Sequence, residues 1–156
     1  MKKMMSVSVM LVLSLCMSSA YSENYRIVKQ NDLDNINEEI ERLKTKCTMK
    51  DDLNITIDWK AIKPFIKSGD NAHIARSCVS HVLSGMEAVC THAGSYKVFK
   101  PDVEGIKAIT VKKGEDGKAE MTYNCETKEI LTVFDEKGNC MGGSIGPFTE
   151  KFDSCE

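Results

Sequence analysis

Residues 71–93, NAHIARSCVSHVLSGMEAVCTHA, are the one long segment in which both the periodicity and the cysteines constrain the fold. Apolar residues and two cysteines recur there at steps of three and four residues, which places them on one face of a helix. That face comprises Ile74, Cys78, Val79, Val82, Leu83, Met86, Val89 and Cys90. The opposite face is polar and can stay in contact with water. The pattern therefore predicts a helix that packs against the core and carries two disulfide anchors.

A second helix is predicted over residues 32–47. Its apolar side chains follow the same steps and end at a cysteine, in the order Leu33, Ile36, Ile40, Leu43 and Cys47. A seam of this length is typical of helix packing within one chain. In the 71–93 helix, Gly85 costs about 1 kcal/mol relative to alanine, so its presence indicates a close approach by another element. We expect the 32–47 helix to pack into the notch at Gly85 and Ala88.

Four segments have the character of short strands. Residues 53–59 alternate apolar and polar side chains, the period of a half-buried strand that would direct Trp59 to the core. Three further candidates cover 106–112, 119–125 and 130–134, and the connections between them have hairpin length. Together the elements predict an α+β fold, in which two helices pack on one face of a small three- to four-stranded antiparallel sheet stapled by disulfides.

The N-terminal residues have the three-part layout of a secretory signal peptide. Lys2 and Lys3 precede an apolar run that is too short to span a bilayer comfortably, and small residues follow near Ala20. A lipoprotein anchored through Cys16 is disfavoured, because Leu15 stands where a small residue is expected.

This layout divides the chain into three parts. We predict a signal peptide over residues 1–22, an N-terminal arm over 23–31 and a single disulfide-stabilised domain over 32–156. No segment after the signal resembles a membrane span. The predicted location is therefore secreted or periplasmic.

Six of the seven cysteines lie after residue 22, an even number that predicts up to three disulfides in an exported chain. They are Cys47, Cys78, Cys90, Cys125, Cys140 and Cys155. Cys78 and Cys90 cannot pair with each other, because twelve helical residues separate them by about 18 Å. An antiparallel meander would return Cys125 to the level of Cys90, with both side chains pointing inward, so the best single pair is Cys90–Cys125. The other pairings stay open.

Two motifs suggest chemistry, and neither is complete. Cys78, His81, Cys90 and His92 are zinc-type ligands, but the separation of the two cysteines keeps them from a single tetrahedral ion. Residues 142–146 match the nucleophile elbow G-x-S-x-G, which requires a later histidine that this chain lacks. The sequence therefore indicates no catalytic residue, no metal ligand and no cofactor.

The remaining features favour a binding protein over an enzyme. The net charge is −2 and no basic stripe is interleaved with aromatic residues, which argues against nucleic acid as a partner. We expect a protein or envelope component as the partner, for an inhibitor or an envelope-associated factor, with the loop at 136–147 as the contact. The alternative is a small secreted hydrolase whose active site has no sequence signature. Asn54 begins a glycosylation sequon that would matter only in a eukaryotic host.

Overall fold

The computed structural model describes the backbone of residues 6–68, 72–92, 94–141, 145–153 and 155, and their side chains from residue 23 onward apart from 145–147. Within these residues the fold is α+β, with five α-helices, one 3-10 helix and a four-stranded mixed sheet. In chain order the elements are α1 (Ser6–Lys44), β1 (Asn54–Ile57), α2 (Trp59–Ser68), α3 (Ile74–Thr91), η1 (Ser95–Phe99), α4 (Lys100–Glu104), β2 (Ala108–Lys113), β3 (Glu120–Asn124), β4 (Glu129–Phe134) and α5 (Ile145–Asp153).

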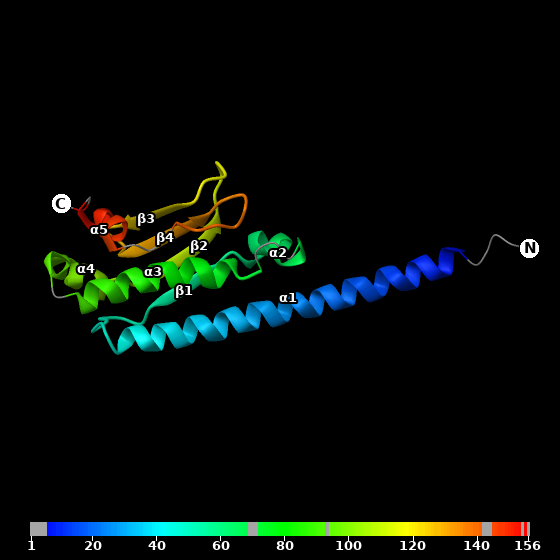
Figure 1. Ribbon diagram of the computed structural model, residues 1–156, viewed down its shortest axis with the longest axis horizontal. Helices are drawn as coiled ribbons and strands as arrows, with labels where there is room; N and C mark the ends of the chain where they lie inside the picture. The colour runs from blue at the N-terminus through cyan, green and yellow to red at the C-terminus, as the bar shows by residue number, and fades with distance from the viewer. Residues whose placement is uncertain (1–5, 69–71, 93, 142–144, 154, 156) are drawn as a thin grey trace, which may run out of the picture.

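The predicted central helix is confirmed as α3, which lies between α1 and the sheet (Figure 1). The predicted apolar face is buried from Ile74 to Val89, and Cys90 is half-buried. Burial extends beyond that face, because α1 and the sheet cover α3 from two sides. The side predicted to be wet is also used, since Ser80 and Glu87 contact α1. The buried area of α3 joins the helical layer and the sheet into one core.

The notch at Gly85 accommodates α5, so the prediction that the first helix packs there is wrong. The ring of Phe148 fills the notch, and a Cβ atom added at Gly85 would lie 2.8 Å from Phe148 Cδ2. Glycine is required at this position because any side chain would displace the ring. The first helix packs on a different side of α3, along Ser80 and Glu87.

The first helix is longer than predicted. α1 runs from Ser6 to Lys44, so the segment 23–31 is helical and not an arm. Val28 in this segment is buried, and the hydroxyl of Tyr25 donates to the carbonyl of Trp59 in α2 at 3.4 Å. The helix therefore packs against α2 before it reaches α3. The signal-peptide interpretation of residues 1–22 stays a prediction.

The sheet has the strand order β1-β2-β4-β3 and is mixed, so the predicted antiparallel meander is wrong. β4 pairs parallel with β2 and antiparallel with β3, and β1 pairs parallel with β2. The reason is that β4 is apolar on both faces, as shown by the buried Ile130 and Val133, and such a strand is favoured in the middle of a sheet. β3 has one polar face and occupies the edge. The six residues between β2 and β3 are enough to pass over β4.

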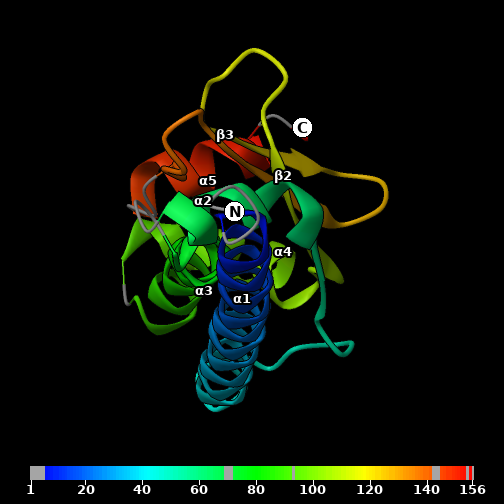
Figure 2. The ribbon, with the colours of Figure 1, turned by 90° about the vertical axis from the view of Figure 1, so that its right-hand side faces the viewer.

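The helices cover one face of the sheet and leave the other open. β1 ends at Ile57, and Trp59 begins α2 instead of extending the strand. Figure 2, which looks along α1 from its N-terminal end, shows the β2–β3 loop at the edge of the molecule farthest from α1. Across the open face runs one row of paired positions, Thr56, Thr110, Leu131 and Thr122.

Candidate binding site

All six cysteines after residue 22 form disulfides, as predicted, but the predicted partner of Cys90 is wrong. The bonds join Cys47 to Cys90, Cys78 to Cys140 and Cys125 to Cys155, with Cα–Cα distances of 5.4, 5.2 and 5.6 Å. The Cys90–Cys125 pair fails because it assumed the antiparallel meander. In the mixed sheet, the end of α1 reaches Cys90, and Cys125 faces the C-terminal segment after α5.

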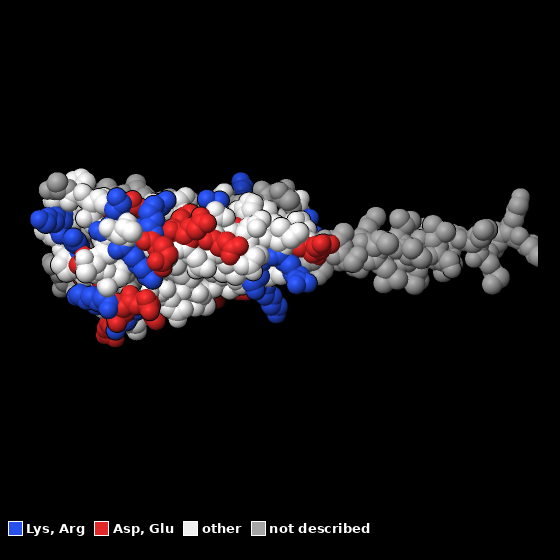
Figure 3. Space-filling model, turned by 90° about the horizontal axis from the view of Figure 1, so that it is seen from below, with Lys and Arg blue, Asp and Glu red and all other residues white. Residues whose placement is uncertain are grey.

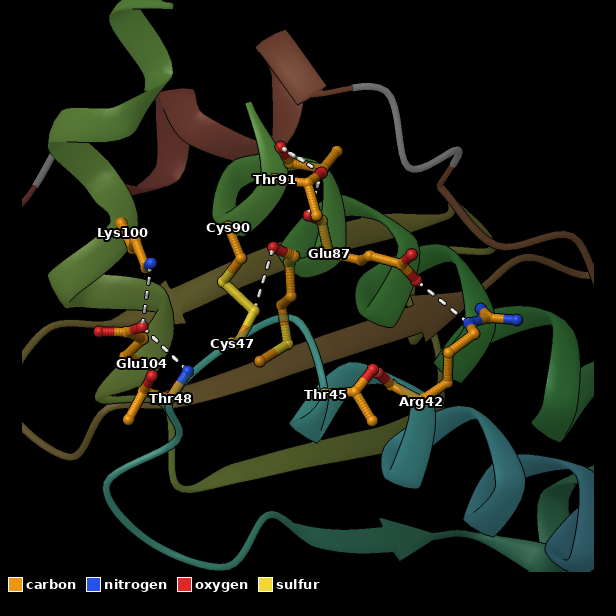
Figure 4. The surroundings of a disulfide bond; sticks show 11 residues. Arg42, Thr45, Cys47, Thr48, Glu87, Cys90, Thr91, Lys100 and Glu104 are labelled. Carbon is orange, nitrogen blue, oxygen red and sulfur yellow. Dashed lines mark hydrogen bonds and ion pairs between the residues drawn. A yellow bond between two sulfur atoms is a disulfide. The ribbon is translucent and has the colours of Figure 1, made fainter. Parts of the chain in front are cut away.

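The surroundings of the Cys47–Cys90 bond have a structural role (Figure 4). Nearby, Arg42 of α1 pairs with Glu87 of α3 at 3.1 Å. Glu104 at the end of α4 accepts the backbone N–H of Thr48 at 3.0 Å. These contacts fasten the end of α1 and the following loop to α3 and α4.

The residues considered as zinc ligands do not come together. Cys78 and Cys90 are oxidised in different disulfides, and the described residues contain no group of three or more side chains suited to a metal. His92 lies on the outside and accepts the backbone N–H of Gly94 at 2.8 Å. The Nδ1 atom of His81 is buried and has no hydrogen-bond partner in the described part of the chain.

One histidine is oriented by a buried carboxylate. Asp32 of α1 is fully buried, and its Oδ1 atom lies 2.7 Å from Nδ1 of His73, whose side chain is largely exposed. Oδ2 of Asp32 accepts the backbone N–H of Arg76 at 3.4 Å, in the first turn of α3. Asp32 thus satisfies a free N–H group at the start of α3. The same geometry resembles the base-and-orienter half of a hydrolytic site.

The glycine-rich segment cannot be assessed as a nucleophile elbow. Ser144 of the G-x-S-x-G pattern, and with it much of the expected contact loop, lies outside the described residues. The described part of that loop is a turn in which Asp135 accepts the backbone N–H groups of Lys137 and Asn139, at 2.9 and 2.7 Å. These donors, together with the side-chain amide of Asn139, lower the pKa of Asp135.

A compact cavity of about 290 Å³ opens where α4, α5 and the C-terminal end of β3 meet. We call it the aromatic cavity. The helices α4 and α5 lie at the left end of the molecule in Figure 1. Three parts of the chain contribute to its wall: η1 with α4, the β3–β4 turn, and the end of α5. The lining residues are Val98, Phe99, Asp102, Cys125, Lys128, Phe152 and Cys155. The Cys125–Cys155 disulfide fixes the turn to the C-terminal segment and so holds two of the three walls together.

Aromatic rings form the apolar part of the cavity. Phe99 and Phe152 are stacked, with ring centroids 6.1 Å apart. Behind them, the ring of Tyr123 meets Phe152 edge-on at 4.8 Å, and Phe148 completes the cluster. Val98 projects at the cavity and is 71% exposed, which is unusual for a large aliphatic side chain. Phe148 and Phe152 belong to the buried core, with exposed fractions of 1% and 4%, so the apolar surface open to a ligand comes from the half-buried Phe99 and the exposed Val98.

Two opposite charges stand on the wall of this cavity. Asp102 and Lys128 both line it, and neither has an ion-pair partner among the described residues. The ammonium group of Lys128 lies 5.7 Å from the centroid of the Tyr123 ring. Lys128 also adopts a positive φ of 60°, a conformation that non-glycine residues rarely hold.

Side-chain hydrogen bonds stabilise the turn that carries Lys128. The side chain of Asn124 accepts the backbone N–H groups of Glu126 and Thr127, at 2.9 and 3.0 Å. This local turn geometry is typical of asparagine. These hydrogen bonds stabilise the backbone of the turn, which places Lys128 on the cavity wall.

Tyr123, next to the aromatic cavity, has a buried hydroxyl group without a hydrogen-bond partner among the described residues. Burial raises the pKa of Tyr123, and the nearby Asp102 carboxylate raises it further. A buried hydroxyl without a partner is rare in proteins and calls for an explanation.

Sequence reasoning missed this cavity, because its residues form no motif. They come from three separate segments, and the sequence pattern singles out only the cysteines among them. The one usable signal was Cys155 near the end of the chain, since a cysteine there must bring the C-terminus to another part of the fold.

A broader hollow of about 710 Å³ lies on the open face of the sheet, beside the β3–β4 turn. It is lined largely by strand residues such as Thr110, Thr122 and Leu131. The threonines there alternate with buried residues, as expected for a solvated sheet face. Among its lining residues only Tyr123 is aromatic, so this hollow is the weaker candidate.

No family model, curated protein or solved structure matches the chain.

Proposed function

We propose that the protein is an exported, disulfide-bonded binding protein that holds its ligand in the aromatic cavity. The observation that carries the proposal is the concentration of unused binding groups at one place. An apolar ring surface, a carboxylate and an ammonium group line one cavity, and an unpartnered hydroxyl lies behind it. Ligand sites combine apolar walls with a few convergent polar groups in this way.

Export is supported by the redox state of the cysteines. Three disulfides link distant parts of the chain, and such bonds persist in oxidising compartments. The N-terminal residues carry the layout of a signal peptide. Among the described residues, no helix combines the length and the apolar character needed to cross a membrane.

The charge distribution supports a ligand other than nucleic acid. The face in Figure 3 carries acidic and basic side chains close together. Between α1 and α3, the pairs Arg42–Glu87 and Arg76–Glu39 also bring opposite charges together. Charges that neutralise each other locally leave no basic field for a phosphate backbone.

The proposal is tested by mapping where an uncharged aromatic probe binds. Amide NMR spectra of the oxidised protein are recorded with increasing N-acetyl-phenylalaninamide, which carries an apolar ring and no charge. We expect the largest shift changes at Phe99, Lys128 and Phe152. Changes confined to Thr110 and Thr122 would move the site to the open face of the sheet. The absence of saturable changes at the cavity with both this probe and free L-phenylalanine would refute the proposal.

A second candidate function, a small hydrolase, is favoured by the pair of Asp32 and His73. A buried carboxylate that fixes the tautomer of an exposed imidazole is the arrangement of a general base. Turnover of generic ester or peptide substrates, abolished in the His73→Ala variant and retained in His92→Ala, would establish this function. Equal activity in both variants would exclude His73 as the base.

A further inference from the structure

The two charges of the aromatic cavity specify the kind of ligand. We propose that the cavity binds a small zwitterion with an apolar side chain, namely an α-amino acid or a dipeptide. This inference rests on the proposed binding function of the cavity. It adds a chemical class of ligand, which the cavity alone does not define.

The cavity wall carries one negative and one positive side chain. Asp102 and Lys128 stand on the same cavity, on α4 and on the β3–β4 turn, and are not paired with each other or with any other described charge. A ligand with a single charge would pair with only one of these two side chains. The other side chain, which has the same sign as the ligand, would lie close to it without a partner. A ligand with an ammonium and a carboxylate group satisfies both, and electrostatic complementarity of this kind gives specificity.

The half-buried Phe99 and the exposed Val98 offer apolar surface on the cavity wall, and Phe99 stacks on the buried ring of Phe152 at a centroid distance of 6.1 Å. An aliphatic or aromatic side chain placed there would bury apolar area, and an aromatic ring would gain a further ring contact. The apolar part of the ligand therefore faces α5 and η1, and its charged groups face Asp102 and Lys128.

The size of the cavity also limits the ligand. The cavity volume of about 290 Å³ is near the lower limit, about 300 Å³, of pockets that bind small molecules. This volume excludes a long peptide segment as the enclosed ligand. It fits a single amino acid or two joined residues, whose ammonium and carboxylate groups remain close together.

The binding of L-phenylalanine to the oxidised full chain, measured by calorimetry and amide NMR, tests the inference. Three analogues remove one or both charges: N-acetyl-phenylalanine lacks the ammonium group, phenylalaninamide lacks the carboxylate, and N-acetyl-phenylalaninamide lacks both. We expect each lost charge to weaken binding about tenfold, which corresponds to about 1.4 kcal/mol. A dipeptide such as glycyl-phenylalanine distinguishes the two possible sources of the zwitterion by its relative affinity.

Variants assign each charge to its partner. Asp102→Asn should weaken the binding of L-phenylalanine about tenfold and leave that of N-acetyl-phenylalanine unchanged. Lys128→Gln should weaken L-phenylalanine to the same extent and leave phenylalaninamide unchanged. Lys112→Gln is the matched control, because Lys112 is an exposed lysine on β2 and does not line the cavity.

The outcomes separate this inference from the proposed function. Binding of the uncharged analogue at the cavity with the same affinity as L-phenylalanine would overturn the zwitterion and leave the binding site standing. Weakening of L-phenylalanine by Lys112→Gln equal to that by Lys128→Gln would also overturn it. No saturable change at the cavity with any of the four compounds would overturn both.

Discussion

The contact between α1 and α3 and the aromatic cavity differ in how their polar groups are paired. On the side of α1, polar groups from the two helices meet in pairs, as in Asp32 with His73, Glu39 with Ser80 and Arg42 with Glu87. The aromatic cavity, lined by η1, α4, the β3–β4 turn and the end of α5, combines Asp102, Lys128 and the hydroxyl of Tyr123, and none of these has a carboxylate, ammonium or hydrogen-bonding partner in the described chain.

This difference separates stability from binding. A polar group paired within the chain stabilises the fold, whereas a group held in place without a partner contributes little to folding and is available to a ligand. Changes on the α1 side should therefore reduce the free energy of unfolding and leave ligand affinity intact. Changes to Asp102 and Lys128 should reduce ligand affinity and leave the free energy of unfolding intact.

The largest effect is expected from removing a disulfide. The Cys47–Cys90 bond closes a separation of 43 residues, so the double variant Cys47→Ala/Cys90→Ala should lose about 4 kcal/mol of unfolding free energy in the chain-entropy model. Denaturant unfolding measures the loss, and the affinity of the folded variant for L-phenylalanine should not change. The matched variant Cys125→Ala/Cys155→Ala should lose stability and affinity together, because that bond lines the cavity. Equal losses of affinity in both would remove the distinction between the contact and the cavity.

The next effect is expected at the buried carboxylate of α1. Asp32→Ala should lower the free energy of unfolding by about 2 kcal/mol, because it removes hydrogen bonds to a charged group and frees the N–H of Arg76. Asp34→Ala is the control, since Asp34 is exposed and accepts only from Gln30 on the same helix. If the two variants are equally stable, Asp32 does not anchor α1 to α3.

A smaller loss is expected at the contact between α3 and α5. Gly85→Ala should destabilise the protein by about 1 kcal/mol, because overpacking against Phe148 outweighs the gain in helix propensity. Ser84→Ala, at the exposed neighbouring position, should gain a few tenths of a kcal/mol. Thermal unfolding of both variants checks the sign, and stabilisation by Gly85→Ala would show that α5 does not occupy the notch.

The smallest effect concerns the pH dependence of the turn at Asp135. Its pKa is lowered in the folded protein, so its contribution to stability is present above the ordinary carboxyl pKa and is lost as the pH falls through the folded value. Amide NMR of Lys137 and Asn139 should show both N–H groups changing together in acid. In Asp135→Asn this transition should disappear, and its persistence would assign it to another group.

The helical layer could be predicted further than the sheet. The three- and four-residue steps in 71–93 fix the buried face of α3 whatever its neighbours are, since helix periodicity is local. The strand order could not be predicted, because hairpin-length connections do not require hairpin pairing, and β4 lies between β2 and β3. The error in the Cys90 pairing followed directly from the assumed strand order.

The candidate site was beyond sequence reasoning for the same physical reason. Asp102 and Lys128 lie on elements that meet only when α5 and the β3–β4 turn close the cavity. Neither residue stands in a recognisable pattern, and Tyr123 looked like an ordinary inward residue of a strand. Only the tertiary arrangement reveals that its hydroxyl has no partner.

The central prediction is that the polar groups at the aromatic cavity have no hydrogen-bond or ion-pair partner within the folded chain. Denaturant unfolding of the Tyr123→Phe variant tests it most directly, because this change removes only the unpartnered hydroxyl. We predict that the free energy of unfolding rises by about 1 kcal/mol. The variant no longer buries a hydroxyl that loses its hydrogen bonds to water on folding and gains none in return. A decrease of 1 kcal/mol or more would mean that the hydroxyl has a partner in the native protein, and would contradict the account.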